Sequence, residues 1–156
     1  MSKRWKPNVT VAAIIEQDGL FLLVEEETSD GLRLNNPAGH LDCGESLPDA
    51  CVRETLEETA YDFTPTSLLG VYLSRPLPNP YMEEGDITYM RFAFCGELGM
   101  FHPERCLDTG IVRTLWMTAD EIRTSTARHR SPVVLQCVED YLLKGMRYPL
   151  SLVRQI

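Results

Sequence analysis

Two apolar runs near the N-terminus constrain the fold more than any other feature of the chain. VTVAAII (9–15) and LFLLV (20–24) are nearly continuous in apolar residues and do not alternate with polar ones. Strands with this pattern are buried on both faces, as in a sheet that lies between layers of helices. The Asp-Gly pair at positions 18 and 19 is a turn signal, so we expect a β-hairpin over residues 9–27.

The size and charge of the chain limit the class of protein. With 156 residues, 44% of them hydrophobic, residues 1–156 are expected to form a single domain with a proper core. A net charge of −8 argues against a nucleic-acid partner. We find no signal peptide, and no apolar stretch approaches the roughly 20 residues that a membrane span needs. The five cysteines are widely spaced and form no C-x-x-C pair, which favours reduced thiols in a cytoplasmic protein.

Further strand and helix signals follow along the chain. Thr118 can cap a short helix, and Ser131 a long one that ends at Gly145. We predict strands at residues 32–34, 67–75, 88–98 and 111–117, and helices at 118–122 and 131–145. The buried stripe of the last helix is predicted to be Val134, Cys137, Val138, Tyr141 and Leu142. The fold class is therefore α/β (α+β), with a mixed β-sheet between helices.

The first helix lies within GHLDCGESLPDACVRETLEETAY, residues 39–61. Ser46 is the expected N-cap, because Pro48 and Asp49 follow it in the first turn. Helical spacing predicts that Val52, Thr55, Leu56 and Thr59 face the sheet. The same spacing places Glu54, Glu57 and Glu58 on the opposite face.

The three glutamates of this helix are unfavourable where they stand. They lie near the C-terminal end, where the helix dipole disfavours negative charge, and no lysine follows four residues later to offset them. A solvated helix face is the alternative, since most charge runs are of that kind. Carboxylates clustered without cysteine or histidine suit Mg²⁺, with Mn²⁺ as a possible substitute. We therefore expect a divalent metal at Glu54, Glu57 and Glu58.

The spacing of the charged residues resembles the Nudix box, G-x5-E-x7-R-E-U-x-E-E-x-G-U, in which U is apolar. Six residues fall on its defining positions: Gly39, Glu45, Arg53, Glu54, Glu57 and Glu58. The chain departs from the pattern at Thr55, at Ala60 and at Tyr61. Ala60 replaces a glycine that normally ends the helix with φ above zero, so we expect strain there or a different helix end. None of these changes removes a carboxylate.

The resemblance implies a fold and a reaction. Nudix (MutT-like) domains are α/β/α sandwiches that hydrolyse phosphoanhydride bonds with Mg²⁺. The resemblance assigns metal binding to Glu54, Glu57, Glu58 and the Gly39 carbonyl, and an orienting role to an ion pair between Glu45 and Arg53. KPNVTVAAII, NNPAGHL and RSPVV…GMRYPL are also similar to a subgroup of small bacterial Nudix phosphatases. That similarity implies orthophosphate release from nucleoside tri- and diphosphates, or from the diphosphate of the thiamine pyrimidine precursor.

Residues outside the box are expected to complete the site. Glu104 and Asp108 are candidates for the general base beside the box glutamates, although a solvated loop acid is the alternative for each. Arg91 is expected to reach phosphate and Tyr81 to stack on the organic group. The cluster Arg128-His129-Arg130 is predicted to be a solvated loop, with a phosphate clamp as the alternative.

Three classes of function remain open from the sequence. The first is a Mg²⁺-dependent hydrolase that acts, as a monomer or homodimer, on a small nucleotide or organic diphosphate. The second is a Nudix domain that binds or senses a nucleotide or an ADP-ribose-type ligand without cleaving it. The third is a structural protein with a solvated glutamate face. The intact set of six box residues favours the first class.

Overall fold

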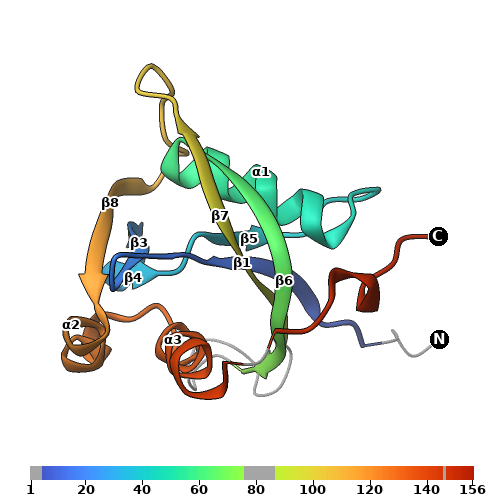
Figure 1. Cartoon of the computed structure of the whole chain (residues 1–156). Helices are drawn as coiled ribbons and strands as arrows, with labels where there is room; N and C mark the ends of the chain where they lie inside the picture. The colour runs from blue at the N-terminus through green and yellow to red at the C-terminus, as the bar shows by residue number, and fades with distance from the viewer. Residues whose placement is uncertain (1–4, 76–86, 146) are drawn as a thin grey trace.

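The computed structural model describes residues 5–75, 87–145 and 147–156. Figure 1 shows α1 on one side of the strands and α2 and α3 on the other. The strands are β1 (Asn8–Ile14), β2 (Glu16–Gln17), β3 (Leu20–Thr28), β4 (Gly31–Asn35), β5 (Ala38–His40), β6 (Tyr61–Ser74), β7 (Tyr89–Phe101) and β8 (Ile111–Thr118). The helices are α1 (Leu47–Thr59), α2 (Ala119–Thr124) and α3 (Val133–Lys144), with 3₁₀ turns η1 (Thr126–Arg128) and η2 (Leu150–Leu152).

The strands form two sheets of four. The first has the order β5-β1-β7-β6, and in it β1 runs parallel to β7 while the other neighbours are antiparallel. In the second sheet β3 pairs with β2, β4 and β8, always antiparallel. The predicted α+β class with a mixed sheet between helices is confirmed, and the second, antiparallel sheet is an addition to it.

The predicted hairpin over residues 9–27 is correct in its turn and wrong in its pairing. Asp18 and Gly19 have φ of 52° and 82°, as the tight hairpin turn requires. Only the two residues of β2 return against β3, however. Both lateral edges of β1 are taken by β5 and β7, so β3 must pair elsewhere. A run of apolar residues shows which faces are buried, and it does not identify the neighbouring strand.

Burial on both faces explains why β1 and β3 are apolar throughout. Successive side chains of a strand point to opposite faces, and those of β1 enter two different clusters. The cluster beneath α1 comprises Val11, Ala13, Ile15, Leu22, Ala50, Cys51, Phe63, Leu68 and Phe94. The cluster against α3 comprises Ile14, Phe21, Leu23, Leu69, Ala93, Cys95, Ile122, Val133, Val134, Cys137 and Val138. Through these two clusters α1 and α3 pack against the first sheet.

The ends of α1 follow the sequence closely. The Ser46 hydroxyl caps the first turn by accepting a hydrogen bond of 3.2 Å from the Asp49 amide. At the other end Ala60 has φ 59° and ψ 19°, the left-handed conformation that ordinarily selects glycine. Its amide still donates to the Leu56 carbonyl, so the helix ends as the Nudix pattern requires and alanine carries the strain.

The buried face of α1 is only partly the predicted one, because Thr55 and Thr59 are buried as predicted and the other two residues are not. Ala50, Cys51, Thr55, Glu58 and Thr59 are buried, whereas Val52 and Leu56 are only half-buried. The two threonines can be buried because their hydroxyls donate to carbonyls one turn earlier, at 2.7 and 2.6 Å. The helix is thereby rotated so that one of the three glutamates turns inward. The prediction that all three lie on the face opposite the sheet is wrong for Glu58.

The two C-terminal helices are confirmed with two corrections. Thr118 caps α2 in a capping box with Glu121, and α3 ends at Gly145, which has φ 53°. Ser131 does not cap α3, because the helix begins after Pro132 without a side-chain cap. Leu142 is exposed and does not belong to the buried stripe.

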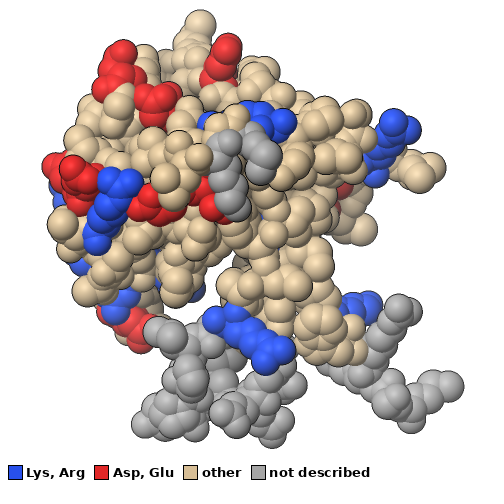
Figure 2. Space-filling view, turned by 60° about the horizontal axis from the view of Figure 1, so that its bottom comes forward, with Lys and Arg blue, Asp and Glu red and all other residues tan. Residues whose placement is uncertain are grey.

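On the face that Figure 2 presents, acidic and basic side chains of the described residues are unevenly distributed. Figure 2 shows acidic side chains gathered on one half of the face it presents, and basic side chains in separate small groups. All five cysteines are free thiols. Among the helices of the described residues, none has the length and apolar character to cross a membrane.

Candidate functional site

Arg53 is the centre of the charged network on α1. Its Nε donates to Glu45 Oε1 at 2.6 Å and its Nη2 to Glu45 Oε2 at 2.9 Å, which makes the pair bidentate. The predicted ion pair is therefore confirmed. Nη2 also donates to the His40 carbonyl at 3.0 Å. The guanidinium thus fastens the loop before the helix to the helix itself.

The same guanidinium contacts two of the three glutamates. Nη1 of Arg53 donates to Glu54 at 2.8 Å and to Glu57 at 3.0 Å. The charge of the arginine partly neutralises a group of carboxylates that would otherwise repel one another. It also holds Glu54 and Glu57 side by side at the edge of the loop.

Glu54 lies directly against Gly39. A Cβ atom built on Gly39 would lie 2.0 Å from the carboxyl carbon of Glu54. The position therefore requires glycine, because any side chain there would push the carboxylate away. Burial is the first cause that raises the pKa of Glu54, and the negative charges of Glu57 and Asp108 add to it.

Glu58 is the most deeply placed of the three glutamates, with 8% of its surface exposed. Its Oε2 accepts a hydrogen bond of 2.8 Å from the Ala38 amide, which ties α1 to β5. Burial raises the pKa of the Glu58 carboxyl to about 8, and the charge of Glu54 acts in the same direction. A cation placed beside these carboxylates would favour their ionised forms.

The donor set fits a hard divalent cation, although a finished coordination site is not preformed. Among residues 5–75, 87–145 and 147–156, no three Asp, Glu, His or Cys side chains are gathered closely enough to hold a metal. Glu54 and Glu57 are instead turned toward Arg53. The chemistry of the donors is nevertheless the one that Mg²⁺ prefers: carboxylate oxygens with raised pKa and a neighbouring backbone carbonyl at Gly39.

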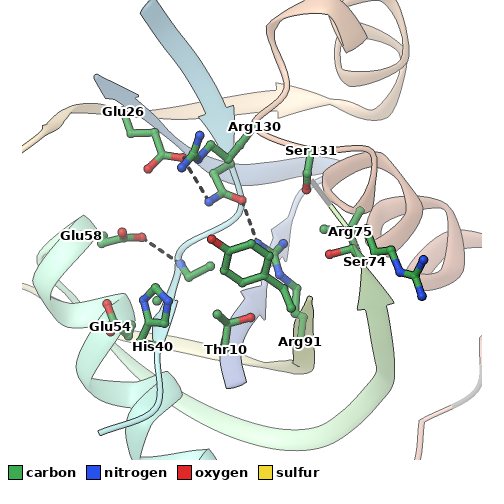
Figure 3. A pocket seen from close by; sticks show the side chains of 15 residues that line it. Thr10, Glu26, His40, Glu54, Glu58, Ser74, Arg75, Arg91, Arg130 and Ser131 are labelled. Atoms are coloured by element: carbon green, nitrogen blue, oxygen red, sulfur yellow. Dashed lines mark hydrogen bonds and ion pairs between the residues drawn. The ribbon is translucent and has the colours of Figure 1, made fainter. Parts of the chain in front are cut away.

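A cavity of about 410 Å³ opens beside this network. Figure 3 shows Glu54 and Glu58 on one side of it and Arg91 on the opposite side. It is lined by Thr10, Glu26, Asn35, Ala38, Gly39, His40, Glu54, Glu58, Ser74, Arg75, Tyr89, Arg91, Arg130, Ser131 and Val133. The cavity therefore has an acidic wall and a basic wall, a charge separation that suits a ligand with both a metal-bound part and a second polar part.

Arg91 forms the buried part of the basic wall, with 8% of its surface exposed. It lies on β7, and its Nη1 and Nη2 donate to the side-chain oxygens of Asn36 and Asn35, both at 3.3 Å. Burial lowers the pKa of Arg91. Arg91 lines the cavity, and its contact with phosphate stays a prediction.

The basic cluster at residues 128–130 is only partly the solvated loop that the sequence predicted, since Arg128 and Arg130 are exposed and His129 is buried. Its backbone is bound to β4, because the Arg130 amide donates to the Leu34 carbonyl at 2.8 Å. His129 is buried, and Arg130 lines the cavity 3.4 Å from Glu26. Arg128 donates a hydrogen bond to Glu25. Two adjacent glutamates of β3 therefore form ion pairs with the two arginines of the cluster.

Glu25 is the buried partner of the cluster and forms ion pairs with Arg128 and Arg113. Its carboxylate is almost fully buried and also accepts from Arg113 Nε at 2.8 Å. The hydrogen bond from Arg113 lowers the pKa of Glu25, and Arg128 contributes in the same direction against the effect of burial. The adjacent glutamates Glu25 and Glu26, which follow the apolar run of the same strand, are the signal that could have indicated paired arginines.

The other predicted site residues, Asp108, Glu104 and Tyr81, differ in how near they lie to the carboxylates of α1. Asp108 is near the helix, because its amide donates to the Glu57 carbonyl at 3.0 Å and its charge raises the pKa of Glu58. Glu104 has a well exposed side chain whose neighbour is His102. Tyr81 lies outside the described residues.

Several cavity residues were not found from the sequence. Tyr89 and His40 place their rings 6.3 Å apart in the cavity wall. Glu26 and Ser131 also line the cavity. His40 follows Gly39 within the box, but the other positions have no distinctive spacing relative to it, so only the packing of β3, β7 and the start of α3 reveals them.

Comparison with known proteins identifies the group to which this site belongs. The family model described as the NUDIX domain matches residues 5–137. Phosphatase NudJ of Escherichia coli (strain K12) is 33% identical over 149 residues, covering 96% of this chain and 92% of that protein. This relative is one of the small bacterial phosphatases that the sequence motifs resemble.

Solved structures give the same result. A NUDIX hydrolase from Nitrosomonas europaea is 50% identical, with a TM-score of 0.88 over 97% of this chain and 98% of that one. The MutT protein from Methanosarcina mazei Go1 has a TM-score of 0.70 over 92% of this chain and 99% of that one. At 20% identity this second likeness concerns the fold alone.

Proposed function

Because the chain belongs to the Nudix hydrolase family, we propose that it hydrolyses phosphoanhydride bonds of nucleoside di- and triphosphates or related organic diphosphates with the help of Mg²⁺. The observation that carries the proposal is the acidic wall of the cavity. Two carboxylates of raised pKa, the partly buried Glu54 and the buried Glu58, face an open space large enough for a nucleotide-sized ligand. Mn²⁺ is a second suitable ion.

Glu54, Glu57, Glu58 and the Gly39 carbonyl would hold the divalent ion. When bound, such an ion neutralises charge on phosphate oxygens and lowers the pKa of a bound water. The chain's own contribution is positional. Glu58 is fixed by the Ala38 amide, whereas Glu54, which Gly39 leaves room for, would have to turn from Arg53 to receive a ligand.

Arg53 and Glu45 have an orienting role in this proposal. Their bidentate pair holds the loop that carries Gly39 at a constant distance from the helix. Arg53 also keeps Glu54 and Glu57 from repelling one another when no metal is bound. A metal that recruited these two carboxylates would replace part of the arginine's contribution.

The general base is proposed to be a carboxylate beside the acidic wall. Asp108 is better placed than Glu104, because its negative charge raises the pKa of both Glu54 and Glu58. Glu104 is exposed and directed toward His102. Arg91, across the cavity, is proposed to bind the substrate. Tyr81 stays a prediction for recognition of the organic group.

The substrate class is taken from the family and from the relatives. The diphosphate of the thiamine pyrimidine precursor is one candidate, and Phosphatase NudJ supports the release of phosphate as the reaction. We further propose that residues 1–156 act as one domain, as a monomer or homodimer, in the cytoplasm. The five free thiols support a reducing compartment.

The test is orthophosphate and pyrophosphate release from a substrate panel, with Mg²⁺ and with EDTA. The panel comprises nucleoside triphosphates and diphosphates, dinucleotides, sugar nucleotides and thiamine-pathway diphosphates. We expect turnover only with the metal, and loss of turnover in Glu57→Gln with little change in melting temperature. Glutamine still offers Arg53 an oxygen, so the network that fastens the loop survives.

Glu97→Gln is the matched control, since Glu97 is an exposed glutamate of β7 outside the cavity. Its turnover should equal that of the wild type. Metal-independent binding of a nucleotide or of ADP-ribose without turnover would favour the sensing module instead. Loss of stability in Glu57→Gln would point to a structural role for the glutamate face.

A further inference from the structure

Arg91 is a buried cation that forms no direct ion pair among the described residues, although the charges of Glu26 and Glu58 act on it across the cavity. Its hydrogen bonds to oxygen among the described residues go to the side chains of Asn35 and Asn36, which are themselves buried and uncharged. The ion pairs within 4.0 Å that the described residues form do not include Arg91. Removing a guanidinium from water is costly unless an anion compensates for it. Glu26 and Glu58 compensate for part of this cost from a distance, and the geometry leaves direct contact with an anion to a ligand in the cavity.

The contacts with Asn35 and Asn36 orient the guanidinium of Arg91 and leave some of its N–H donors available. Guanidinium has five N–H donors in a planar fork, and the contacts to Asn35 and Asn36 occupy two of them at the long distance of 3.3 Å. A planar fork of this kind suits two oxygens of one phosphate group. Asn35 also donates to Glu26 at 3.3 Å, so the orientation of its amide is set from the other side.

A second arginine reaches the same cavity from a different element. Arg130 is held at its backbone by Leu34 and at its side chain by Glu26. Ser131, the next residue, lines the cavity with a hydroxyl that does not cap α3. Figure 3 shows Arg130 and Ser131 on the side of the cavity away from Glu54 and His40.

We propose that Arg91, Arg130 and Ser131 form a phosphate subsite that works without metal and holds a phosphate of the substrate beyond the two that the glutamate wall receives. The inference rests on the proposed function for the nature of the substrate. Its ligand is a tetrahedral oxyanion, carried either at the end of the polyphosphate chain or on the organic group. The acidic and basic walls would then bind different phosphates of one molecule.

Binding of inorganic phosphate in EDTA tests the subsite directly. Calorimetric titration of the full chain should show saturable binding that Arg91→Gln and Arg130→Gln each weaken by about 10-fold or more. Arg91→Lys should retain part of the affinity, because a point charge replaces the fork. Arg154→Gln, a change of an exposed arginine near the C-terminus, should bind like the wild type.

Equal affinity in wild type, Arg91→Gln and Arg130→Gln overturns the proposal, as does absence of saturable binding in the wild type. Thermal melts confirm that each variant is folded. If Arg91→Gln does not fold, Arg130→Gln decides, because its side chain is half-exposed. The titration contains no metal, so a wild type that binds phosphate and shows no Mg²⁺-dependent turnover contradicts the proposed function alone.

Kinetics with Mg²⁺ then identify the phosphate that is bound. ADP, ATP and adenosine 3′-phosphate 5′-diphosphate are compared in wild type and in Arg91→Gln. A rise in KM confined to ATP assigns the terminal phosphate, and a rise confined to the 3′-phosphate compound assigns the organic group. An equal rise for ADP contradicts a subsite for an additional phosphate.

Discussion

Replacing Arg53 with alanine removes a guanidinium that donates hydrogen bonds to three carboxylates and lies 3.7 Å from a fourth, that of Asp42. Glu45 loses a bidentate partner at 2.6 and 2.9 Å, and Glu54 and Glu57 lose their common partner at 2.8 and 3.0 Å. The carbonyl of His40 loses its donor as well. The variant therefore leaves three acidic groups close together without a positive charge between them.

The cost of this change can be bounded from the geometry. Breaking a fully buried ion pair costs about 3–5 kcal/mol. The Arg53 side chain keeps 27% exposure, so water can solvate part of the vacated network, and we expect a loss of about 3 kcal/mol in the free energy of unfolding. For a domain of this size, that loss lowers the melting temperature by about 6–12 °C.

Arg123→Ala is the matched control for this experiment. Arg123 also forms a bidentate pair, with Glu139, and a second contact with Asp120. Its side chain is 41% exposed and its partners lie on the surface, so its loss should cost less than about 1 kcal/mol. Chemical denaturation of both variants, at low ionic strength and at about 0.15 M salt, provides the comparison.

The reasoning is refuted if Arg53→Ala is no less stable than Arg123→Ala. Arg53→Lys gives an intermediate test, because lysine keeps the charge and cannot form the bidentate contact with Glu45. We expect it to recover part of the stability and to leave metal-dependent turnover below that of the wild type. Full recovery of both by lysine would show that charge alone, and not the fork, positions the loop.

Three further changes test other parts of the structure. Gly39→Ala should displace the Glu54 carboxylate and lower turnover about 10-fold or more with less than about 1 kcal/mol lost in stability; unchanged turnover contradicts the close contact. Ala60→Gly should be within about 1 kcal/mol of wild type in denaturant unfolding, since relief of the left-handed strain offsets the lost methyl, whereas Ala50→Gly should cost about 2 kcal/mol; equal costs refute the strain. Glu25→Gln should destabilise by about 2 kcal/mol at neutral pH. Because the folded-state pKa of Glu25 lies below its unfolded value, that stabilisation is present above the unfolded pKa and is lost as pH falls through the folded pKa. Unfolding curves of wild type and Glu25→Gln should therefore converge in acid, and a gap that stays constant with pH rules out the ion pairs as its source.

Features that depend on neighbours in the sequence could be predicted from the sequence alone. The cap at Ser46 and the helix end at Gly145 each involve residues that are close in the sequence, whereas the pairing of Glu45, which precedes the helix, with Arg53 follows from the resemblance to the Nudix box. Backbone geometry fixes such relations, because a helix brings residues three, four and seven apart onto one face. The spacing of the six box residues is therefore enough to predict the acidic wall.

Only the tertiary structure decided the other wall of the cavity. Arg91 and Asn35 are 56 residues apart, and Arg128 and Glu25 are 103 apart. Contacts of that separation depend on which strands lie beside one another, and that choice is made by packing of the whole core rather than by local pattern. The same reason explains the wrong partner for β1 and the burial of Glu58. Periodicity specifies how polar and apolar residues alternate along an element, whereas the orientation of that element depends on everything packed against it.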